Sequence, residues 1–253
     1  MAHPKGADSR GVVVELLKHS CASILQAIAA VFTDILQPKA EIPTYWRRTR
    51  LKVLFKKGDT TQPGNYRPIS ILPILYKVFS RIVLSRIRGA LELSQSVDQA
   101  GFRSGFACDD HLFAVTLLTE KCNEFKRPLW IVTVDFCKAF DTVDQDCLWE
   151  ALIEQGVQAE YVDVLMRLYC GQTGQVQCDR LSKTFSIERG TRQGDPMSPV
   201  CFNVVLESII GKIVPEWQSK RCGMQLNPGD LMQNLKFSDD LLLVAPSIYQ
   251  AKS

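Results

Sequence analysis

The apolar positions in the first quarter of the chain recur mainly with helical spacing. Over residues 11–37 they recur every three or four positions, which predicts a long amphipathic helix with a break near residues 19–20 and an end at Pro38. Residues 51–55 are apolar except for one lysine, which is typical of a strand. Residues 56–65 are rich in Gly, Pro, Asp and Thr and predict a loop.

The middle of the chain alternates between helical and strand patterns. A strand and then a helix follow the loop, and residues 75–91 have the apolar spacing of that helix with basic residues between. Residues 129–134 form a short apolar run, which predicts a buried strand that ends at Asp135. Helical spacing resumes after Asp141, and the candidate N-caps of this helix are Thr142, Asp141 and Asp144.

The last third combines two hairpin patterns with one apolar helix. Residues 174–187 alternate as a hairpin does, and residues 196–213 predict a buried helix with a proline in its first turn. Residues 235–244 are mostly apolar on both sides of Ser238, Asp239 and Asp240, which predicts a tight strand-turn-strand hairpin. Strands interleaved with helices indicate an α/β or α+β domain.

The charge of the chain is unevenly distributed. The 253 residues carry 30 Lys and Arg against 27 Asp and Glu, a net charge of +3 that alone does not indicate a nucleic-acid partner. Residues 44–104, however, hold twelve basic and three acidic residues, so this segment is +9 and the remainder is −6. This pattern suits a protein that holds a polyanion in one place and cations in another, although a solvated helix face explains it equally well.

The cysteines and the apolar runs exclude several protein classes. Nine cysteines without a C-x-x-C pair disfavour a zinc site and a disulfide framework, and they favour a reducing, intracellular compartment. Charged residues interrupt the first thirty positions, and no unbroken apolar run approaches the roughly 18 residues of a membrane span. We therefore expect no secretion signal and no membrane partner.

Two predicted strand ends carry carboxylates. Asp135 ends one apolar strand, and Asp239 and Asp240 lie at the tip of a hairpin between apolar flanks. Buried charges require a partner, and Mg²⁺ is usually held by one or two carboxylates together with substrate phosphates. Two such ions would clamp the attacking and leaving oxygens of a phosphoryl transfer. The alternative is that Asp239 and Asp240 belong to an ordinary turn and that Asp135 is an ordinary cap.

Five segments, in this order along the chain, resemble the motifs of reverse transcriptases from non-LTR (LINE-type) retrotransposons. They are Asn65–Ser70 and Gln99–Arg103, which resemble finger motifs, and Val134–Asp141, Arg189–Pro199 and Phe237–Asp240, which resemble palm motifs. The resemblance implies an α+β fold with the fingers and palm of a right-hand polymerase, the palm being a small antiparallel sheet backed by helices. It places the fingers, with an N-terminal helical segment, at residues 1–128 and the palm at residues 129–253, ending after the hairpin without a thumb.

The resemblance also implies roles for the acidic residues. Asp135, Asp239 and Asp240 would be catalytic and would hold two Mg²⁺ ions, or Mn²⁺ in their place, with the carbonyl of Phe136 as a further ligand. Ser238 stands where the family usually has alanine before the paired aspartates.

Residues around these carboxylates are expected to bind the nucleotide and the nucleic acid. By resemblance, Phe140 would be the aromatic gate that excludes a 2′-hydroxyl, while Gln193 and Gly194 would lie against the incoming nucleotide. The remaining expected contacts are basic side chains, which suit phosphates: Arg67, Lys56 and Lys57 for the triphosphate, and Arg47, Arg48, Arg50 and Arg103 for the nucleic acid.

The function implied is that of an RNA-directed DNA polymerase, as part of a retrotransposon polyprotein located in the nucleus or cytoplasm. It would extend the 3′-hydroxyl of a DNA primer with deoxynucleoside triphosphates on an RNA template. One alternative is a truncated, inactive remnant that binds nucleic acid. Another is the palm of an RNA-dependent RNA polymerase, which the bulky Phe140 disfavours.

Overall fold

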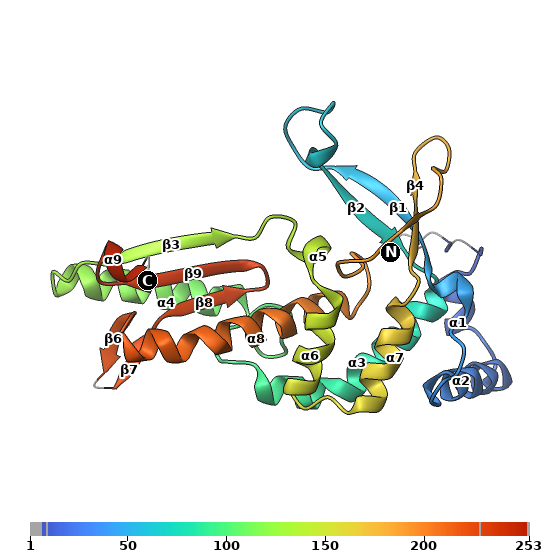
Figure 1. The fold of residues 1–253 in the computed structure, drawn as a ribbon, viewed down its shortest axis with the longest axis horizontal. Helices are drawn as coiled ribbons and strands as arrows, with labels where there is room; N and C mark the ends of the chain where they lie inside the picture. Colours follow the sequence, from blue (N-terminus) through green and yellow to red (C-terminus); the bar gives the residue numbers. More distant parts are fainter. Residues whose placement is uncertain (1–6, 9, 228, 252–253) are drawn as a thin grey trace. The chain divides into compact units, whose positions relative to one another are not determined.

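A computed structural model describes residues 7, 8, 10–227 and 229–251, and these residues form two compact units (Figure 1). Unit 1 comprises residues 1–90 and 140–198, and unit 2 comprises residues 91–139 and 199–253. Each unit is therefore built from two separate stretches of chain. The division into fingers at 1–128 and palm at 129–253 follows the chain order instead, and it stays a prediction.

Unit 1 combines a four-stranded sheet with helices. Its elements are α1 (Val14–Lys18), α2 (Ala22–Leu36), the 3-10 helices η1 (Thr44–Trp46) and η2 (Pro63–Asn65), β1 (Arg48–Phe55), β2 (Tyr66–Ile71), α3 (Ile74–Ser94, as far as Ala90), α5 (Ala139–Thr142, from Phe140), α6 (Gln145–Glu154), α7 (Ala159–Tyr169), β4 (Thr173–Gln177) and β5 (Phe185–Ser186). The strand order is β2-β1-β4-β5, and β1 pairs antiparallel with β2 and parallel with β4. The predicted helix over 11–37 is thus two helices, with the break at the predicted place.

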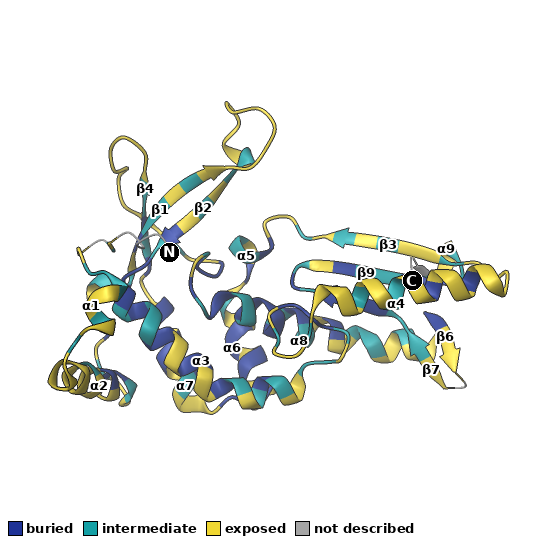
Figure 2. Ribbon diagram, turned by 180° about the vertical axis from the view of Figure 1, so that it is seen from behind, coloured by how far each residue is buried: buried dark blue, intermediate teal, exposed yellow. Residues whose placement is uncertain are grey.

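The core of unit 1 is built around aromatic side chains. The ring of Trp46, which is 1% exposed, lies 5.3 Å from that of Phe79 and 5.8 Å from that of Tyr76. Phe32 is one of only two buried residues of α2, and most of that helix is exposed (Figure 2). Trp46 therefore stabilises the fold of this unit through burial and edge-on aromatic packing.

Unit 2 contains a three-stranded antiparallel sheet and a separate two-stranded ribbon. Its elements are α4 (Cys108–Glu124), β3 (Trp130–Asp135), α8 (Ser198–Ser219, from residue 199), β6 (Met224–Asn227), β7 (Asp230–Met232), β8 (Asn234–Phe237), β9 (Asp240–Ala245) and α9 (Ile248–Ala251). The sheet order is β3-β9-β8, and β6 pairs with β7. Leu118 and Cys122 of α4 form a cluster with Met224 and Val244, so α4 covers part of this sheet.

Two details of a strand and of the short helices differ from the sequence-based predictions. The strand over 129–134 was expected to be buried, but β3 is an edge strand with one neighbour, and its Trp130 and Ile131 are exposed. Of the candidate caps, Thr142 lies at the end of the four-residue α5, while Asp144 caps α6 as expected: its carboxylate accepts from the backbone N–H groups of residues 146 and 147. The spacing of apolar residues alone does not show that α5 and α6 are separate helices.

The helix predicted over 196–213 is α8, which is longer than expected and has Pro199 in its first turn. Its Val204, Leu206 and Ile210 are buried. Among the described helices, α8 alone is long and apolar enough to cross a membrane, and a helix in the core of a protein meets the same two conditions.

Candidate active site

The hairpin of β8 and β9 places Asp239 in a two-residue turn. Phe237 and Asp240 form the last cross-strand pair, so Ser238 and Asp239 are the two turn residues. Ser238 has φ +59°, which residues other than glycine rarely adopt, and Asp239 does not have a positive φ. The turn therefore exists as predicted, with an unusual backbone at the residue before Asp239.

The register of β3 with β9 brings two of the three predicted carboxylates together. Asp135 is the direct cross-strand partner of Asp240, so both side chains leave the same face of the sheet. Residues opposite each other in an antiparallel pair have Cβ atoms about 4.5–5.5 Å apart. Asp239 follows directly in the chain, and Phe136 comes one residue after Asp135, with its ring 6.4 Å from that of Phe202.

The chemistry of this group fits a divalent cation. Like charges directly opposite each other destabilise a sheet, and none of the ion pairs in the described part of the chain includes Asp135, Asp239 or Asp240. Asp135 and Asp240 are exposed and Asp239 is half-buried, so a ligand can reach them. Within the same described residues no three His, Cys, Asp or Glu side chains are grouped closely enough to hold a metal ion by themselves. Carboxylate oxygens supplemented by substrate oxygens are the usual ligands of Mg²⁺.

The loop of residues 190–197 holds two of the predicted nucleotide contacts in unit 1, Gln193 and Gly194. The side-chain amide of Gln193 donates to Asp141 over 2.8 Å, and its backbone carbonyl accepts from the N–H of Ser70, also over 2.8 Å. Gly194 has φ +108°, and a Cβ there would lie 2.9 Å from the carbonyl oxygen of Ser70. Only glycine fits this close approach without strain. Asp141, expected to cap a helix, instead orients Gln193.

Two buried charged side chains of the same loop hold it in place. Arg192 donates to the carbonyls of Trp46 and Leu168, each over 2.8 Å, and its guanidinium lies 4.8 Å from the ring centre of Tyr76. Asp195 accepts from the hydroxyls of Tyr76 and Ser80. Burial raises the pKa of Tyr76 well above its usual value of 10, so this phenol stays protonated and donates. Arg192 and Asp195 lie in the Arg189–Pro199 segment, and the local sequence does not reveal that their side chains are buried.

Phe140 lies beside this loop. It is half-buried in α5, and its carbonyl accepts from the backbone N–H of Thr191 over 2.7 Å. Unit 1 therefore brings Phe140 close in structure to the segment of Gln193 and Gly194, although 51 positions separate Phe140 from Thr191.

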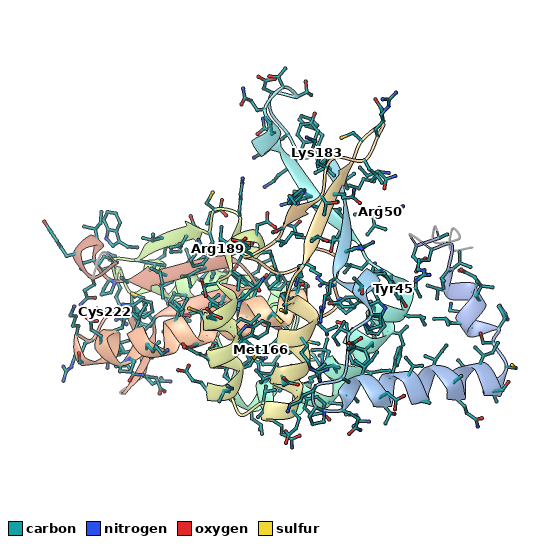
Figure 3. The ribbon with its side chains drawn as sticks, turned by 45° about the vertical axis from the view of Figure 1, so that its right-hand side comes forward. Tyr45, Arg50, Met166, Lys183, Arg189 and Cys222 are labelled. Atoms are coloured by element: carbon teal, nitrogen blue, oxygen red, sulfur yellow. The ribbon has the colours of Figure 1, made fainter. Side chains whose placement is uncertain are left out.

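The basic residues of β1 and β2 share one face of the sheet. Arg48, Arg50 and Leu54 are separated by even numbers of positions on β1, so their side chains project from the same face of the sheet. Arg67 of β2 is the cross-strand partner of Leu54 and therefore projects from that face as well. Arg48 and Arg67 are exposed and Arg50 is half-buried. Figure 3 labels Arg50 on β1 and Lys183 on the loop between β4 and β5. Lys56 and Lys57 are exposed directly after β1, while Arg47 is half-buried before it.

Arg103 was expected to contact nucleic acid, but the structure uses its guanidinium inside unit 2. It forms an ion pair with Glu92 at 3.0 Å, and it donates to the carbonyls of Ser96 and Gln99. The guanidinium also lies 4.2 Å from the ring centre of Phe106, and the side chain is 8% exposed. These contacts fix the segment around residue 99 and leave Arg103 out of the candidate surface.

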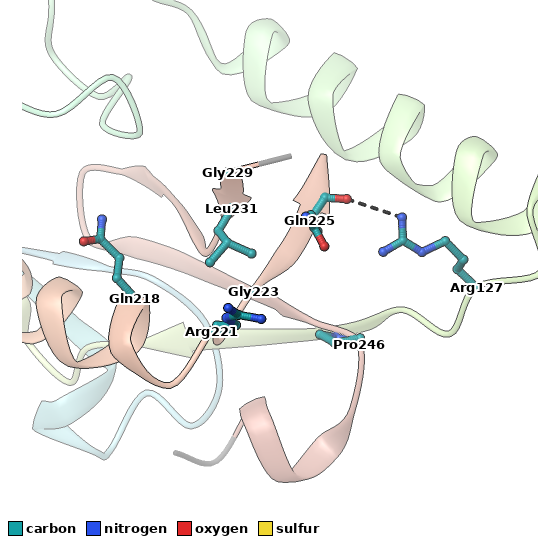
Figure 4. A pocket seen from close by; sticks show the side chains of 8 residues that line it. All are labelled: Arg127, Gln218, Arg221, Gly223, Gln225, Gly229, Leu231 and Pro246. Carbon is teal, nitrogen blue, oxygen red and sulfur yellow. Dashed lines mark hydrogen bonds between the residues drawn. The ribbon is translucent and has the colours of Figure 1, made fainter. Parts of the chain in front are cut away.

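A pocket of unit 2 contains none of the predicted site residues. It is lined among others by Arg127, Gln218, Arg221 and Leu231, and the Arg127 guanidinium donates to the carbonyl of Gln225 over 3.3 Å (Figure 4). The carboxylates of the hairpin turn are not part of this lining, so the pocket does not describe the candidate site.

Comparison with protein families matches residues 55–253 to the family described as reverse transcriptase (RNA-dependent DNA polymerase). Among curated proteins, the chain is 29% identical over 226 residues to a Pol polyprotein of retrotransposable element R2 from Popillia japonica. It is 27% identical over 206 residues to the R2DM Pol polyprotein of Drosophila melanogaster. These matches cover 84% and 81% of the chain but only 29% and 19% of the relatives, so the chain spans less than a third of their length.

Solved structures show the same fold at lower sequence identity. A telomerase from Candida tropicalis matches with a TM-score of 0.57 at 12% identity, covering 91% of this chain and 50% of that one. A telomerase from Candida albicans, solved in complex with a fragment of telomeric RNA, matches with a TM-score of 0.58 at 12% identity, covering 95% and 44%. The expected polymerase fold is thereby confirmed.

Proposed function

Because the chain belongs to the reverse transcriptase (RNA-dependent DNA polymerase) family, we propose that it carries the nucleotide-adding centre of an RNA-directed DNA polymerase. It extends the 3′-hydroxyl of a DNA primer with deoxynucleoside triphosphates on an RNA template, as part of a non-LTR retrotransposon polyprotein. The observation that carries this proposal is the register of β3 with β9, which sets Asp135 opposite Asp240 beside the Asp239 turn. The odd number of cysteines supports the reducing compartment expected for it, the nucleus or cytoplasm.

The carboxylates have distinct proposed roles. Enzymes of this family use divalent metal ions, and we propose two Mg²⁺ ions, or Mn²⁺ in their place, held by Asp135 and Asp239 with the carbonyl of Phe136. When bound, such ions lower the pKa of the attacking hydroxyl and neutralise charge on the leaving phosphate. Asp240, opposite Asp135, supplies further negative charge that favours cations at this end of the sheet.

The residues of unit 1 have proposed roles in positioning substrates. Gln193, oriented by Asp141, contacts the incoming nucleotide, and Gly194 allows its close approach to the backbone. The ring of Phe140 occupies the space that a 2′-hydroxyl would need. Arg67, Lys56 and Lys57 bind the triphosphate, while Arg48 and Arg50, with Arg47 beside them, bind the phosphates of the template and primer. Positioning and charge stabilisation account for most of the catalysis of phosphoryl transfer.

The test is primer extension by the full chain and by its Asp239→Asn variant. The change removes one charge and one carboxylate oxygen, so we expect extension to fall by about 100-fold or more while binding of primer and template is retained. Asp230→Asn is the matched control, because Asp230 is an exposed aspartate of β7 outside the turn. Activity of Asp239→Asn within about tenfold of the parent would contradict the metal-binding role.

The same assay separates the alternatives. A parent chain that binds primer and template but adds no nucleotide would be the inactive remnant. A parent chain that prefers ribonucleoside triphosphates would be an RNA polymerase.

A further inference from the structure

The turn that carries Asp239 has a backbone that needs support. The first residue of this turn, at position 238, has a positive φ, a conformation that glycine adopts far more readily than other residues. Ser238 occupies this position with φ +59° and is buried. A non-glycine residue persists in such a conformation only where its surroundings determine it. The neighbours of Ser238 therefore decide whether Asp239 has a fixed position.

The side chain of Gln99 binds the backbone of Ser238 on both sides. Its Oε1 accepts from the N–H of Ser238 over 2.9 Å, and its Nε2 donates to the carbonyl of Ser238 over 3.5 Å. The same Oε1 accepts from the N–H of Gly101 over 2.8 Å. Gln99 is 1% exposed, so these bonds form away from water, where an unmade bond is costly. One neutral amide thus satisfies both polar backbone groups of the strained residue.

Gln99 is itself held against the hairpin. The backbone N–H of Lys236 donates to the carbonyl of Asp98 over 2.7 Å, and the N–H of Ala100 donates to the carbonyl of Lys236 over 2.9 Å. These bonds form a short parallel bridge between residue 99 and β8. Asn203 of α8 donates to the carbonyl of Gly101 over 2.7 Å. The segment that carries Gln99 is therefore attached to the hairpin and to a helix of the same unit.

Gly101 allows this segment to approach the turn. A Cβ at Gly101 would lie 2.3 Å from the backbone nitrogen of Ser238, a distance that real side chains do not tolerate. The φ of Gly101 lies outside the left-handed range, so a larger residue is excluded by the turn and not by its own backbone. Ser238 is therefore held in two independent ways: Gln99 binds its backbone by hydrogen bonds, and the backbone of Gly101 packs closely against its backbone nitrogen.

We propose that Gln99 is a positioning residue for Asp239: its amide holds Ser238 in the left-handed conformation and thereby fixes the carboxylate of the next residue for metal binding. This inference rests on the proposed function of Asp239. Residues that orient a metal ligand commonly change metal affinity when replaced, although they do not touch the ion.

The first variant is Gln99→Met, which keeps the length of the side chain and removes its hydrogen bonds. We expect about tenfold weaker Mn²⁺ binding in a calorimetric titration and about tenfold slower nucleotide addition, with unchanged affinity for primer and template. Amide hydrogen exchange of residues 236–240 should become faster. The matched control is Gln172→Met, since Gln172 is equally buried and its side-chain amide has no hydrogen-bond partner. This control should leave all four measurements unchanged.

The second variant is Gly101→Ala, which displaces the turn and keeps Gln99. It should weaken Mn²⁺ binding and speed exchange of residues 236–240 in the same direction as Gln99→Met. Its control is Gly211→Ala, because an added Cβ at Gly211 of α8 meets no atom within 4 Å. If Gln99→Met does not fold, Gly101→Ala against Gly211→Ala decides the question alone.

The outcomes separate this inference from the proposed function. If Gln99→Met and Gly101→Ala keep the Mn²⁺ affinity and the exchange rates of the parent, the positioning role is wrong, whatever the polymerase assay shows. Equal losses in Gln99→Met and Gln172→Met would also overturn it, because they would reflect general stability. If both test variants weaken Mn²⁺ binding but the parent adds no nucleotide, the positioning role stands and the polymerase function is wrong.

Discussion

The loop that carries Gln193 in unit 1 and the turn that carries Asp239 in unit 2 are both anchored by buried polar side chains, but the anchors differ in origin and charge. The loop of unit 1 is anchored by its own residues Arg192 and Asp195, which bind carbonyls and hydroxyls beneath it. The turn of unit 2 is anchored by the neutral amide of Gln99, which lies 139 positions earlier.

This difference concerns the groups that bond the turn backbone directly, since Lys236, a buried residue of the same hairpin, forms an ion pair with Glu207. A buried guanidinium or carboxylate makes stronger hydrogen bonds than an amide, and it also adds a full charge to its surroundings. Beside a group of carboxylates proposed to bind cations, such a charge would change the affinity for the metal. Gln99 fixes the backbone of Ser238 without adding charge. The loop in unit 1 has no carboxylate among its predicted nucleotide contacts, so charged anchors are compatible with its role.

The largest effect is expected from Arg192→Met. The change leaves two buried carbonyls without donors, so we expect the free energy of unfolding to fall by about 3 kcal/mol or more. Gln99→Met should cost less, about 1–3 kcal/mol, because no charged group is lost. Urea denaturation measures both. Arg189→Met is the control, since Arg189 is exposed just before the same loop, and it should change stability by about 0.5 kcal/mol or less. Equal costs for Arg192→Met and Gln99→Met would remove the distinction between charged and neutral anchors.

Phe140→Ala should change the choice of sugar. If the ring occupies the space of a 2′-hydroxyl, its removal raises the ratio of ribonucleotide to deoxynucleotide incorporation by about tenfold. Phe140 is half-buried, so the loss of stability should stay below the about 3–5 kcal/mol of a fully buried phenylalanine. Single-nucleotide incorporation kinetics measure the ratio. Phe32→Ala, a core change in the same unit, should lower both rates together, and the same result for Phe140→Ala would mean that Phe140 is only a core residue.

Replacing Arg48 and Arg50 with alanine should weaken binding through phosphate contacts alone. Each lost contact makes the slope of log affinity against log salt shallower by about 0.9 on duplex or about 0.7 on a single strand. Fluorescence anisotropy over a range of salt concentrations gives the slope. The control pair is Arg81 and Arg86, which are exposed on α3 of the same unit. If both pairs change the slope equally, the shared face of β1 and β2 is not a specific binding surface.

The smallest effect concerns Asp98, next to Gln99. Burial raises the pKa of Asp98 above its usual value of 3.8. Attraction to Lys236 and His111 lowers this pKa, and repulsion from Glu207 raises it, but burial has the largest effect. The folded state therefore disfavours the ionised form, and stability falls as pH rises from 3.8 through the raised pKa. Asp98→Asn should have a slightly higher melting temperature at pH 7, with a gain that disappears below pH 3.8.

In the parent chain Lys236 of β8 is paired with Glu207 at 2.9 Å, and Asp98→Asn leaves both of these residues in place. Asp230→Asn should show no such gain at any pH. A gain for Asp98→Asn that did not change with pH would mean that burial of its charge is not the cause.

The sequence predicted those features that depend on local pattern. The apolar flanks of Asp239 predicted the hairpin, and the polar residues near 19–20 predicted the break between α1 and α2. The meeting of Asp135 with Asp240 depends on strand register, which periodicity does not specify, and the family resemblance supplied the expectation that they act together. The roles of these carboxylates stay a prediction.

Features that depend on distant contacts were not predictable. Nothing near Gln99 indicates that its amide meets a turn 139 positions later, and Arg103 has the sequence context of a surface residue although Glu92 binds it internally. β3 is an edge strand with exposed side chains, and an apolar run reveals neither property. Of the candidate caps, Asp144 and not Thr142 caps α6, because the chain makes a separate short helix first.

The parallel pairing of β1 with β4 has a consequence for synthesis and folding. β1 lies between β2 and β4 in its sheet, but Arg48 pairs with Thr173, so one edge of β1 stays unpaired until the later strand has left the ribosome. Contacts between residues so far apart in the chain slow folding, and unpaired edges promote aggregation meanwhile. The basic side chains along β1 discourage such edge pairing by mutual repulsion between chains, so the charge proposed to bind nucleic acid also protects the nascent chain.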